Sequence, residues 1–447
     1  MDVIYPTELD RAHFAALEKD LDAILHDSVM PVPAYGVMAF RDGKLLYQGC
    51  KGRRRIDAQH PENDLPFETS TRFRTASISK VFVTLGVMRL VEQGTLELDR
   101  DVSDYLGFPL RNPSYPDTTI TLRMLLSHTS SIRDGSVYSI PPEDNIEQFF
   151  LSEGTYFLGG EHFANSDDGV DRAPGKFFAY TNLNYGVIGT IFERLSGERF
   201  DVYMKKHVLE PMGLEASFNV GDFTAKQLHN LSPIYQSKNG EHWDASQPWQ
   251  AQIDDYHDEV QPCDQVLITN PDLGGTNMLA DLRDYHIGYN GTLFSPQGGL
   301  RISMEELKVL AELFLTDGCI GGKRFLSKES IDTMFTPYWT YSESANNGDT
   351  YDGLMTCYGL GIQVFTSGKR DRFLRHRTVV MSGHFGEAYG LLAGLFVNRE
   401  RQDGIFYMIN GQGAPDVDHH GDYSGMYQWE EHLCTALLDN LFPEEEQ

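Results

Sequence analysis

Ser77 and Lys80 have complementary chemistry and lie three positions apart, near the start of an apolar segment. Both belong to the run 73–80, which reads as a strand-to-helix junction, and the apolar stretch 81–91 follows directly. Residues at positions i and i+3 of a helix lie on one face, so the hydroxyl and the amine would be presented together. A lysine in this register can activate a serine nucleophile. The pair therefore predicts an enzyme that forms acyl intermediates.

The predicted helix after this pair helps to decide whether the pair is functional or occurs by chance. The spacing S-x-x-K is common by chance, and a serine helix cap followed by a surface lysine would also produce it. Residues 81–91 are apolar nearly all round, which predicts a buried helix, and Gly94 suits its C-terminal end. A lysine one turn into a buried helix is costly unless it is paired or functional. This favours the functional interpretation.

Tyr180 and Asn182 lie in a turn that enters a second apolar helix, over 187–195. A tyrosine near a lysine can be acidified and accept a proton. An asparagine amide can bind an acyl-chain carbonyl and the lysine at the same time. A core tyrosine with a satisfied hydroxyl is the alternative interpretation.

His384, Gly386 and Glu387 lie on or beside a strand near the C-terminus. Strand alternation puts His384 and Gly386 on one face and Phe385 on the other. A glycine there would let substrate approach the backbone, and the N–H of Glu387 could complete an oxyanion hole with the N–H of Ser77. A purely structural histidine is the alternative.

The elements expected to position these residues come from both ends of the chain. We predict helices over 7–27 and 427–441, a hairpin of 35–40 and 45–48, and strands over 379–381, 390–397 and 404–409. They suggest one antiparallel sheet, in an α/β lobe of about 1–75 and 290–447. A helical lobe of about 76–289 would complete a single catalytic domain. Ser77 then falls at the border of the lobes, where ligand clefts tend to lie.

Two segments, 135–170 and 215–272, read as insertions that shape the substrate site as lids. The net charge of −28, from 37 basic and 65 acidic side chains, disfavours nucleic acid and anionic membranes as partners. No apolar run has the length that spans a bilayer, and no signal peptide is visible at the N-terminus. Five scattered cysteines suggest free thiols, so we expect a cytoplasmic location.

The segment 416–422 has a superficial likeness to a metal site. It places Asp416, Asp418 and Gly421 at the first, third and sixth positions of a calcium loop, but His420 and Tyr427 occupy the fifth and twelfth. It shows no H-E-x-x-H zinc pattern either. We therefore expect no metal and no cofactor. The sequence also lacks the G-x-S-x-G elbow of α/β-hydrolases.

The three constellations occur in an order that is typical of one family. The matching segments are 73–77, 90–99, 125–130, 180–182, 298–303, 358–361 and 384–386. The chain resembles the serine β-lactamase and penicillin-binding-protein superfamily. It is most similar to the branch of class C β-lactamases, D-alanyl-D-alanine carboxypeptidases, D-aminopeptidases and related esterases. The resemblance covers most of residues 35–410, apart from the two insertions.

The resemblance implies a β-lactamase/transpeptidase-like α/β (α+β) fold, with an antiparallel sheet flanked by helices plus a helical lobe. It implies that Ser77 is the nucleophile, Lys80 its activating partner, Tyr180 the general base or proton shuttle, and Asn182 a substrate-positioning group. Which of Lys80 and Tyr180 takes the serine proton stays open, since the two can titrate as a coupled pair.

By the same resemblance His384 takes the place that lysine fills in the β-lactamases of this branch, as it often does in the peptidases. Gly386 and the backbone of Glu387 would edge the acyl site. Phe385 departs from the family pattern, in which a small or hydroxylated residue is usual. This departure, the acidic composition and the missing signal peptide weaken an antibiotic-resistance role.

These observations predict a metal-free serine hydrolase that forms an acyl-Ser77 intermediate with a small ester or amide, most similar to an esterase or amidase. A D-alanyl-D-alanine carboxypeptidase or D-aminopeptidase acting on D-amino-acid peptides is the alternative that His384 favours. A penicillin-binding sensor with little turnover is a third possibility, from a different functional class. The oligomeric state is not predicted.

Overall fold

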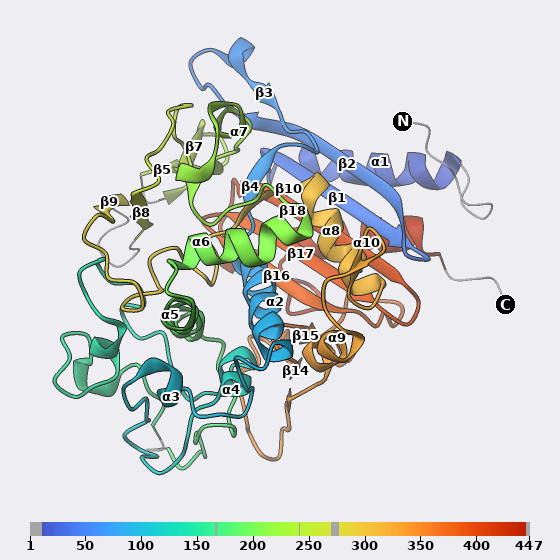
Figure 1. The fold of residues 1–447 in the computed structure, drawn as a ribbon. Helices are drawn as coiled ribbons and strands as arrows, with labels where there is room; N and C mark the ends of the chain where they lie inside the picture. Colours follow the sequence, from blue (N-terminus) through green and yellow to red (C-terminus); the bar gives the residue numbers. More distant parts are fainter. Residues whose placement is uncertain (1–10, 166–167, 241, 270–276, 444–447) are drawn as a thin grey trace.

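A twelve-stranded sheet forms the centre of the computed structural model, which describes residues 11–165, 168–240, 242–269 and 277–443 (Figure 1). Its main path runs β13 (Trp339–Thr340), β14 (Cys357–Tyr358), β15 (Gln363–Val364), β16 (Ser382–Ala388), β17 (Leu391–Asn398), β18 (Asp403–Gln412), β1 (Ala34–Arg41), β2 (Lys44–Arg55) and β3 (Leu65–Pro66). Neighbours on this path are antiparallel. Because β1 pairs with β18, the two ends of the chain form one sheet, as the sequence predicts.

The hairpin of β1 and β2 forms where the sequence predicts it. Asp42 and Gly43 at its tip have φ angles of 51° and 72°. Two left-handed residues in succession match the twist of the flanking strands, and Asp-Gly is a pair that adopts this conformation readily. The local sequence therefore determines the turn and the pairing next to it, and an irregularity between Ala39 and Phe40 shifts the register of the remaining pairs.

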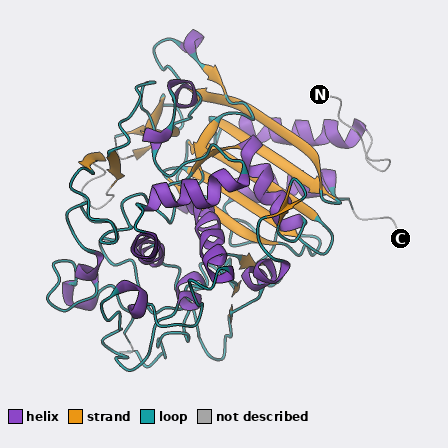
Figure 2. Ribbon diagram, in the orientation of Figure 1, coloured by secondary structure: helices purple, strands orange, loops and turns teal. Residues whose placement is uncertain are grey.

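Helices cover both faces of the sheet (Figure 2). On one face, α1 (Arg11–Leu25) and α10 (Gln428–Leu441) pack against the side chains of Val37, Phe396 and Tyr407. On the opposite face, α2 (Ser79–Glu92) and α8 (Met304–Leu315) share a core with Met38 and Leu395. Successive strand residues alternate between the two cores, as a sheet with both faces buried requires.

The central part of the chain forms helices and long loops on the α2 side of the sheet (Figure 1). Its helices are α3 (Ser103–Leu106), α4 (Leu122–Leu126), α5 (Leu183–Ser196), α6 (Phe200–Met204) and α7 (Ala225–His229), and α9 (Lys328–Phe335) lies nearer the sheet. The short strand pairs are β4 (Arg72–Arg74) with β10 (Arg301–Ser303), β8 (Gln265–Thr269) with β9 (Asn277–Asp281), and β11 (Cys319–Ile320) with β12 (Lys323–Arg324). The helix α2 lies between the sheet and these helices, and most of its residues are buried.

The two segments expected to be insertions differ in structure. Residues 135–170 contain two short 3-10 turns, Ile146–Phe149 and Leu158–Gly160, joined by loops. Residues 215–272 contain β5 (Ile234–Asn239), β6 (His242–Trp243) and β7 (Trp249–Ile253), and β5 adds to the main sheet in parallel with the end of β18. The second segment is therefore built into the sheet, in addition to any role beside the site.

Several predicted boundaries differ from the structure. The first predicted helix spans Arg11–Leu25, and its expected residues 7–10 lie outside the described part of the chain. The strand expected over 379–381 begins only at Ser382, where β16 first pairs with β15, and Val380 before it is exposed. The described residues contain no helix of the length and apolar character that crossing a membrane requires. They also contain no group of three potential His, Cys, Asp or Glu metal ligands.

Candidate active site

Ser77 lies at a sharp junction between the strand β4 and the helix α2. The residues Ala76–Ile78 form a 3-10 turn and α2 begins at Ser79, so Ser77 precedes the α-helix by two residues. Ala76 has a φ angle of 46°, a left-handed conformation that is costly for a residue with a side chain. Ala76 and Ile78 are buried, whereas Ser77 is partly exposed. The junction therefore presents the Ser77 hydroxyl while its neighbours hold the turn in the core.

Lys80 is fully buried, and its amine contacts three oxygen atoms. Lys80 Nζ lies 2.9 Å from Ser77 Oγ, 2.8 Å from Asn182 Oδ1 and 2.9 Å from the carbonyl oxygen of Gln297. The Asn182 and Gln297 oxygens can only accept hydrogen bonds, whereas the Ser77 hydroxyl can accept or donate. A neutral amine can donate its two hydrogens to the two pure acceptors, which directs its lone pair at Ser77.

Aromatic rings surround this amine. Lys80 Nζ lies 4.8 Å from the ring centre of Tyr180 and 5.5 Å from that of Tyr185. Burial lowers the pKa of Lys80 to about 7, although the Asp134 carboxylate acts in the opposite direction. A large fraction of the amine is therefore neutral near pH 7, which a general base requires.

Tyr180 stands at the cavity wall in the turn before α5. Burial raises the pKa of its phenol well above the ordinary value, although a hydrogen bond with Ser77 acts in the opposite direction. The phenol is therefore protonated near neutral pH, in contrast to the acidified tyrosine that the sequence suggested. The reason is burial, which penalises a phenolate more than the hydrogen bond with Ser77 stabilises it.

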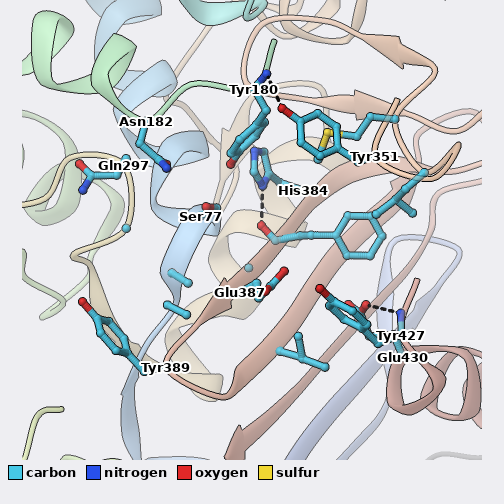
Figure 3. A pocket seen from close by; sticks show the side chains of 18 of the residues that line it. Ser77, Tyr180, Asn182, Gln297, Tyr351, His384, Glu387, Tyr389, Tyr427 and Glu430 are labelled. Atoms are coloured by element: carbon cyan, nitrogen blue, oxygen red, sulfur yellow. Dashed lines mark hydrogen bonds between the residues drawn. The ribbon is translucent and has the colours of Figure 1, made fainter. Parts of the chain in front are cut away.

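Two residues that sequence analysis did not single out hold the Tyr180 segment. The ring of His128 stacks on that of Tyr180, with centres 4.3 Å apart, and His128 Nδ1 accepts a hydrogen bond from the Thr181 N–H at 3.0 Å. On the other side, the Tyr180 N–H donates to the hydroxyl of Tyr351 at 3.0 Å (Figure 3). His128 lies within a stretch that carried the family resemblance, but no local signal marked Tyr351.

His384 is buried, and both of its ring nitrogens are engaged. Its Nδ1 lies 2.5 Å from the Phe385 carbonyl oxygen, which can only accept, so Nδ1 carries the hydrogen and Nε2 accepts from the Tyr358 hydroxyl at 2.8 Å. Burial and the nearby Lys80 lower the pKa of His384 to about 3. The histidine is thus a neutral residue beside Tyr180, whose ring centre is 6.0 Å away. The sequence missed Tyr358 as its partner.

The strand β16 has the alternation that the sequence predicts. Phe385 packs into the core under α1 and α10, with its ring centre 4.8 Å from that of Phe396. Gly386 faces the nucleophile turn, and a Cβ atom added to it would lie 2.4 Å from the Thr75 carbonyl oxygen. The glycine thus permits contact between two backbones, β16 and the nucleophile turn, whereas the sequence suggested an approach by substrate.

A cavity of about 560 Å³ opens in front of Ser77 (Figure 3). Six of the seven predicted site residues line it, namely Ser77, Tyr180, Asn182, His384, Gly386 and Glu387, and Lys80 lies buried behind Ser77. The remaining wall is rich in aromatic side chains, including Tyr138, Tyr351, Tyr389 and Tyr427. The structure therefore brings residues from three distant parts of the sequence to one cavity that can hold a small molecule.

Acidic side chains outnumber basic ones along the cavity wall. Arg74, the one arginine or lysine among the described residues that line it, donates two hydrogen bonds to the buried carboxylate of Asp254. Glu387 presents a carboxylate to the cavity, and burial and nearby Asp416 raise its pKa to about 7. Glu430 lines the same side. The cavity thus has an acidic edge and a basic residue that is already bonded to a buried carboxylate.

Comparisons with known proteins find relatives in sequence and in structure. The family model described as Beta-lactamase matches residues 22–425. Penicillin-binding protein 4* of Bacillus subtilis (strain 168) is 25% identical over 348 residues, which are 76% of this chain and 61% of that protein. This chain spans about half the length of the curated relatives it matches.

Two solved structures show the same fold at low sequence identity. The hydrolase EstCE1, described as having promiscuous acyltransferase activity, is 20% identical with a TM-score of 0.59, and the match covers 96% of this chain and 100% of that one. The D-amino acid amidase from Ochrobactrum anthropi SV3 is 15% identical with a TM-score of 0.60, and the match covers 97% and 100% of the two chains. The fold predicted from the sequence is confirmed.

Proposed function

Because the chain belongs to the Beta-lactamase family, we propose that it is a serine hydrolase that forms an acyl-Ser77 intermediate from a small ester or amide. The observation that carries the proposal is the contact set of Lys80, whose amine lies 2.9 Å from Ser77 Oγ and beside two pure acceptors. This arrangement supports Lys80 as the group that takes the serine proton. The raised pKa of Tyr180 supports a different role for the phenol, as a proton donor.

In the acylation step, Lys80 accepts the serine proton and Tyr180 supplies a proton to the leaving group. Ser77 Oγ bonds to the substrate carbonyl carbon as its proton passes to the neutral Lys80 amine, and the carbonyl electrons move to the oxygen. The N–H groups of Ser77 and Glu387 hold that oxyanion, an arrangement in which one donor contributes about 3 kcal/mol in other enzymes. Tyr180 donates its proton to the leaving group as the carbonyl re-forms, and the Lys80 ammonium restores the phenol.

Deacylation uses the same residues with water as the nucleophile. A water molecule gives a proton to Lys80 and its oxygen bonds to the acyl carbon. Ser77 Oγ then leaves and recovers its proton from Lys80. Asn182 lines the cavity, where its amide can bind an acyl-chain carbonyl.

An esterase or amidase activity fits this cavity best, and one observation favours a second candidate. Recognition of a free carboxylate, as a carboxypeptidase requires, needs an available cation, but two nitrogens of Arg74 already donate to the Asp254 carboxylate and His384 is neutral. The carboxylate of Glu387 instead suits a substrate with a free amino group. We therefore infer that a D-aminopeptidase-type amidase is the second candidate and a D-alanyl-D-alanine carboxypeptidase the less favoured one.

Intact-protein mass spectrometry tests the proposal. Wild type and Ser77→Ala are each incubated with a fluorophosphonate probe, p-nitrophenyl acetate and a fluorescent penicillin. We expect the probe to add covalently to wild type alone and the ester to turn over without a lasting adduct. Labelling of Ser77→Ala would move the nucleophile elsewhere. A stoichiometric penicillin adduct with no turnover of any substrate would support a sensor instead.

Substrate pairs that differ in one charge separate the hydrolase candidates. Hydrolysis of D-alanine p-nitroanilide is compared with that of its N-acetyl derivative, which has no ammonium group. A preference for the free amine that falls in Glu387→Gln would support the aminopeptidase-type activity. Equal rates for the two compounds, with faster ester turnover, would support the esterase. Release of D-alanine from an N-acyl-D-alanyl-D-alanine peptide would support the carboxypeptidase.

A further inference from the structure

Asp134 lies one layer behind the cavity, and its two carboxylate oxygens have different donors. Its Oδ1 accepts a hydrogen bond from the backbone N–H of Leu183 at 2.8 Å, and its Oδ2 accepts one from Asn182 Nδ2 at 3.0 Å. Leu183 is the first residue of α5, so this carboxylate satisfies an N–H group that the helix itself leaves unpaired. The carboxylate thus joins the loop after His128 to the beginning of the helix that follows Tyr180.

The chemistry of these contacts determines which way the Asn182 amide faces. An ionised carboxylate only accepts hydrogen bonds, so it binds the NH₂ side of the amide. The carbonyl side must then point away from Asp134, and it meets Lys80 Nζ at 2.8 Å. A rotated amide would place oxygen against carboxylate and hydrogens against the amine, with both hydrogen bonds lost.

The charge of Asp134 also distinguishes it from the other titratable groups around Lys80. His128 and His384 have lowered pKa values, and Tyr180 and Tyr185 have raised ones, chiefly because they are buried. These four groups are therefore neutral near pH 7. Asp134 is the carboxylate that acts on Lys80, and it opposes the effect of burial on the amine.

Few charged groups compete for the Asp134 carboxylate. Arg133, the preceding residue, pairs with Asp349 at 2.9 Å. The phenol of Tyr351 is neutral because burial raises its pKa. The imidazole of His162 is also neutral near pH 7, because burial lowers its pKa. Burial raises the pKa of Asp134 itself, whereas the hydrogen bonds from Leu183 and Asn182 and the nearby Lys80 amine lower it.

We propose that Asp134 is a positioning residue of the acyl-transfer site, which orients the Asn182 amide so that Lys80 is held in register with Ser77. This inference rests on the proposed function, because it assigns Lys80 the role of proton acceptor. Asp134 touches neither the nucleophile nor the cavity. It acts through Asn182. Because only one amide hydrogen of Asn182 bonds to Asp134, the second remains for a substrate carbonyl.

The substitution Asp134→Asn tests the proposal with little change in volume. The new amide can still accept from the Leu183 N–H, but it then presents hydrogens to the hydrogens of Asn182. We expect kcat/KM for p-nitrophenyl acetate to fall by about 10²-fold, as when a catalytic group is displaced by about 1 Å. We also expect the acid limb of the kcat/KM profile to move to lower pH, because the lysine loses a negative neighbour.

The same substitution at an exposed carboxylate is the matched control. Asp99→Asn removes a charge of the same sign from an ion pair with Arg123, in which the carboxylate is exposed to solvent. Its acid limb should stay at the wild-type pH. A fall in activity of Asp134→Asn with an unmoved acid limb, or no fall at all, would overturn the proposal, since a merely structural role would not shift the limb.

A swap variant keeps the test decisive if Asp134→Asn unfolds. Asp134→Asn combined with Asn182→Asp restores complementary hydrogen bonds but places the carboxylate directly against Lys80. Its acid limb should move above the wild-type pH, and a limb at or below the wild-type pH would refute the proposal. Fluorophosphonate labelling of wild type separates the two hypotheses. If wild type is not labelled, the proposed function is refuted. If wild type is labelled but the Asp134 variants keep its activity and acid limb, this inference alone is refuted.

Discussion

The contact between Gly386 and the nucleophile turn leads to a quantitative prediction for Gly386→Ala. The added Cβ would lie 2.4 Å from the Thr75 carbonyl oxygen, and real Cβ atoms essentially never approach closer than 3.0 Å. Both partners are backbone, so β16 and the turn that carries Ser77 must move apart. Overpacking of this kind typically costs about 1–3 kcal/mol of stability.

The catalytic effect should exceed the effect on stability. In the proposed mechanism the N–H groups of Ser77 and Glu387 lie on the two backbones that separate. Loss of one oxyanion donor lowers kcat by about 10²–10³-fold in other hydrolases. We expect a loss of about 10²-fold for Gly386→Ala, with a fold that still unfolds cooperatively.

Two assays on two variants measure this effect. The rates of fluorophosphonate labelling and of p-nitrophenyl acetate hydrolysis report on the site, and thermal unfolding reports on the fold. Gly298→Ala is the matched control, because Gly298 also lines the cavity and faces the same turn. Its Cβ would meet the nearest atom, in Ala76, at an ordinary 3.6 Å. Wild-type rates and stability in Gly386→Ala would refute the reasoning, as would an equal loss in Gly298→Ala.

Further predictions concern titration, a buried hydrogen bond, a buried charge and metals. Since the pKa of Lys80 is lowered to about 7, kcat/KM should rise with pH through about 7 as the amine loses its proton, and a flat profile from pH 5 to 8 would contradict this. Tyr358→Phe leaves the Nε2 atom of His384 without its donor, which should lower the free energy of unfolding by about 1–3 kcal/mol in urea titrations. Asp254 is buried between two arginines that hold its pKa well below the usual value despite burial, so Asp254→Asn should cost about 3–5 kcal/mol. Because that pKa is lowered on folding, its contribution is present above the unfolded pKa of about 3.9 and lost as pH falls below it, which thermal melts from pH 7 to 3 would show. EDTA should leave activity unchanged, and inhibition by it would contradict the metal-free mechanism.

Local patterns were sufficient for much of the fold. The β1–β2 hairpin follows from Asp42 and Gly43, and the alternation around Phe385 follows from the pleat of a strand. The strand expected at 379–381 was wrong because apolar composition alone does not supply a partner, and pairing with β15 starts at Ser382. The length of a strand depends on its neighbours, which a local pattern does not contain.

The protonation states of the site residues could not be predicted from the sequence. The pattern showed that Lys80 and Tyr180 could act as a pair but not which of them would be neutral. That depends on the aromatic rings around the amine and on Asp134, which come from distant parts of the chain. The same holds for Tyr358, which donates to His384 across 26 positions of sequence.

The sequence by itself thus determined the chemistry that is available, namely a serine and a lysine one turn apart, a tyrosine and an asparagine before a helix, and a histidine on a strand. These are properties of residue type and short-range spacing, which the periodicity of helices and strands converts into direction. The tertiary structure alone decided that Lys80 is buried away from solvent, that Asn182 turns its oxygen toward Lys80, and that Gly386 leaves room for two backbones to pack together. Burial, amide orientation and backbone approach are relations between segments far apart in the chain. They exist only once the segments have packed.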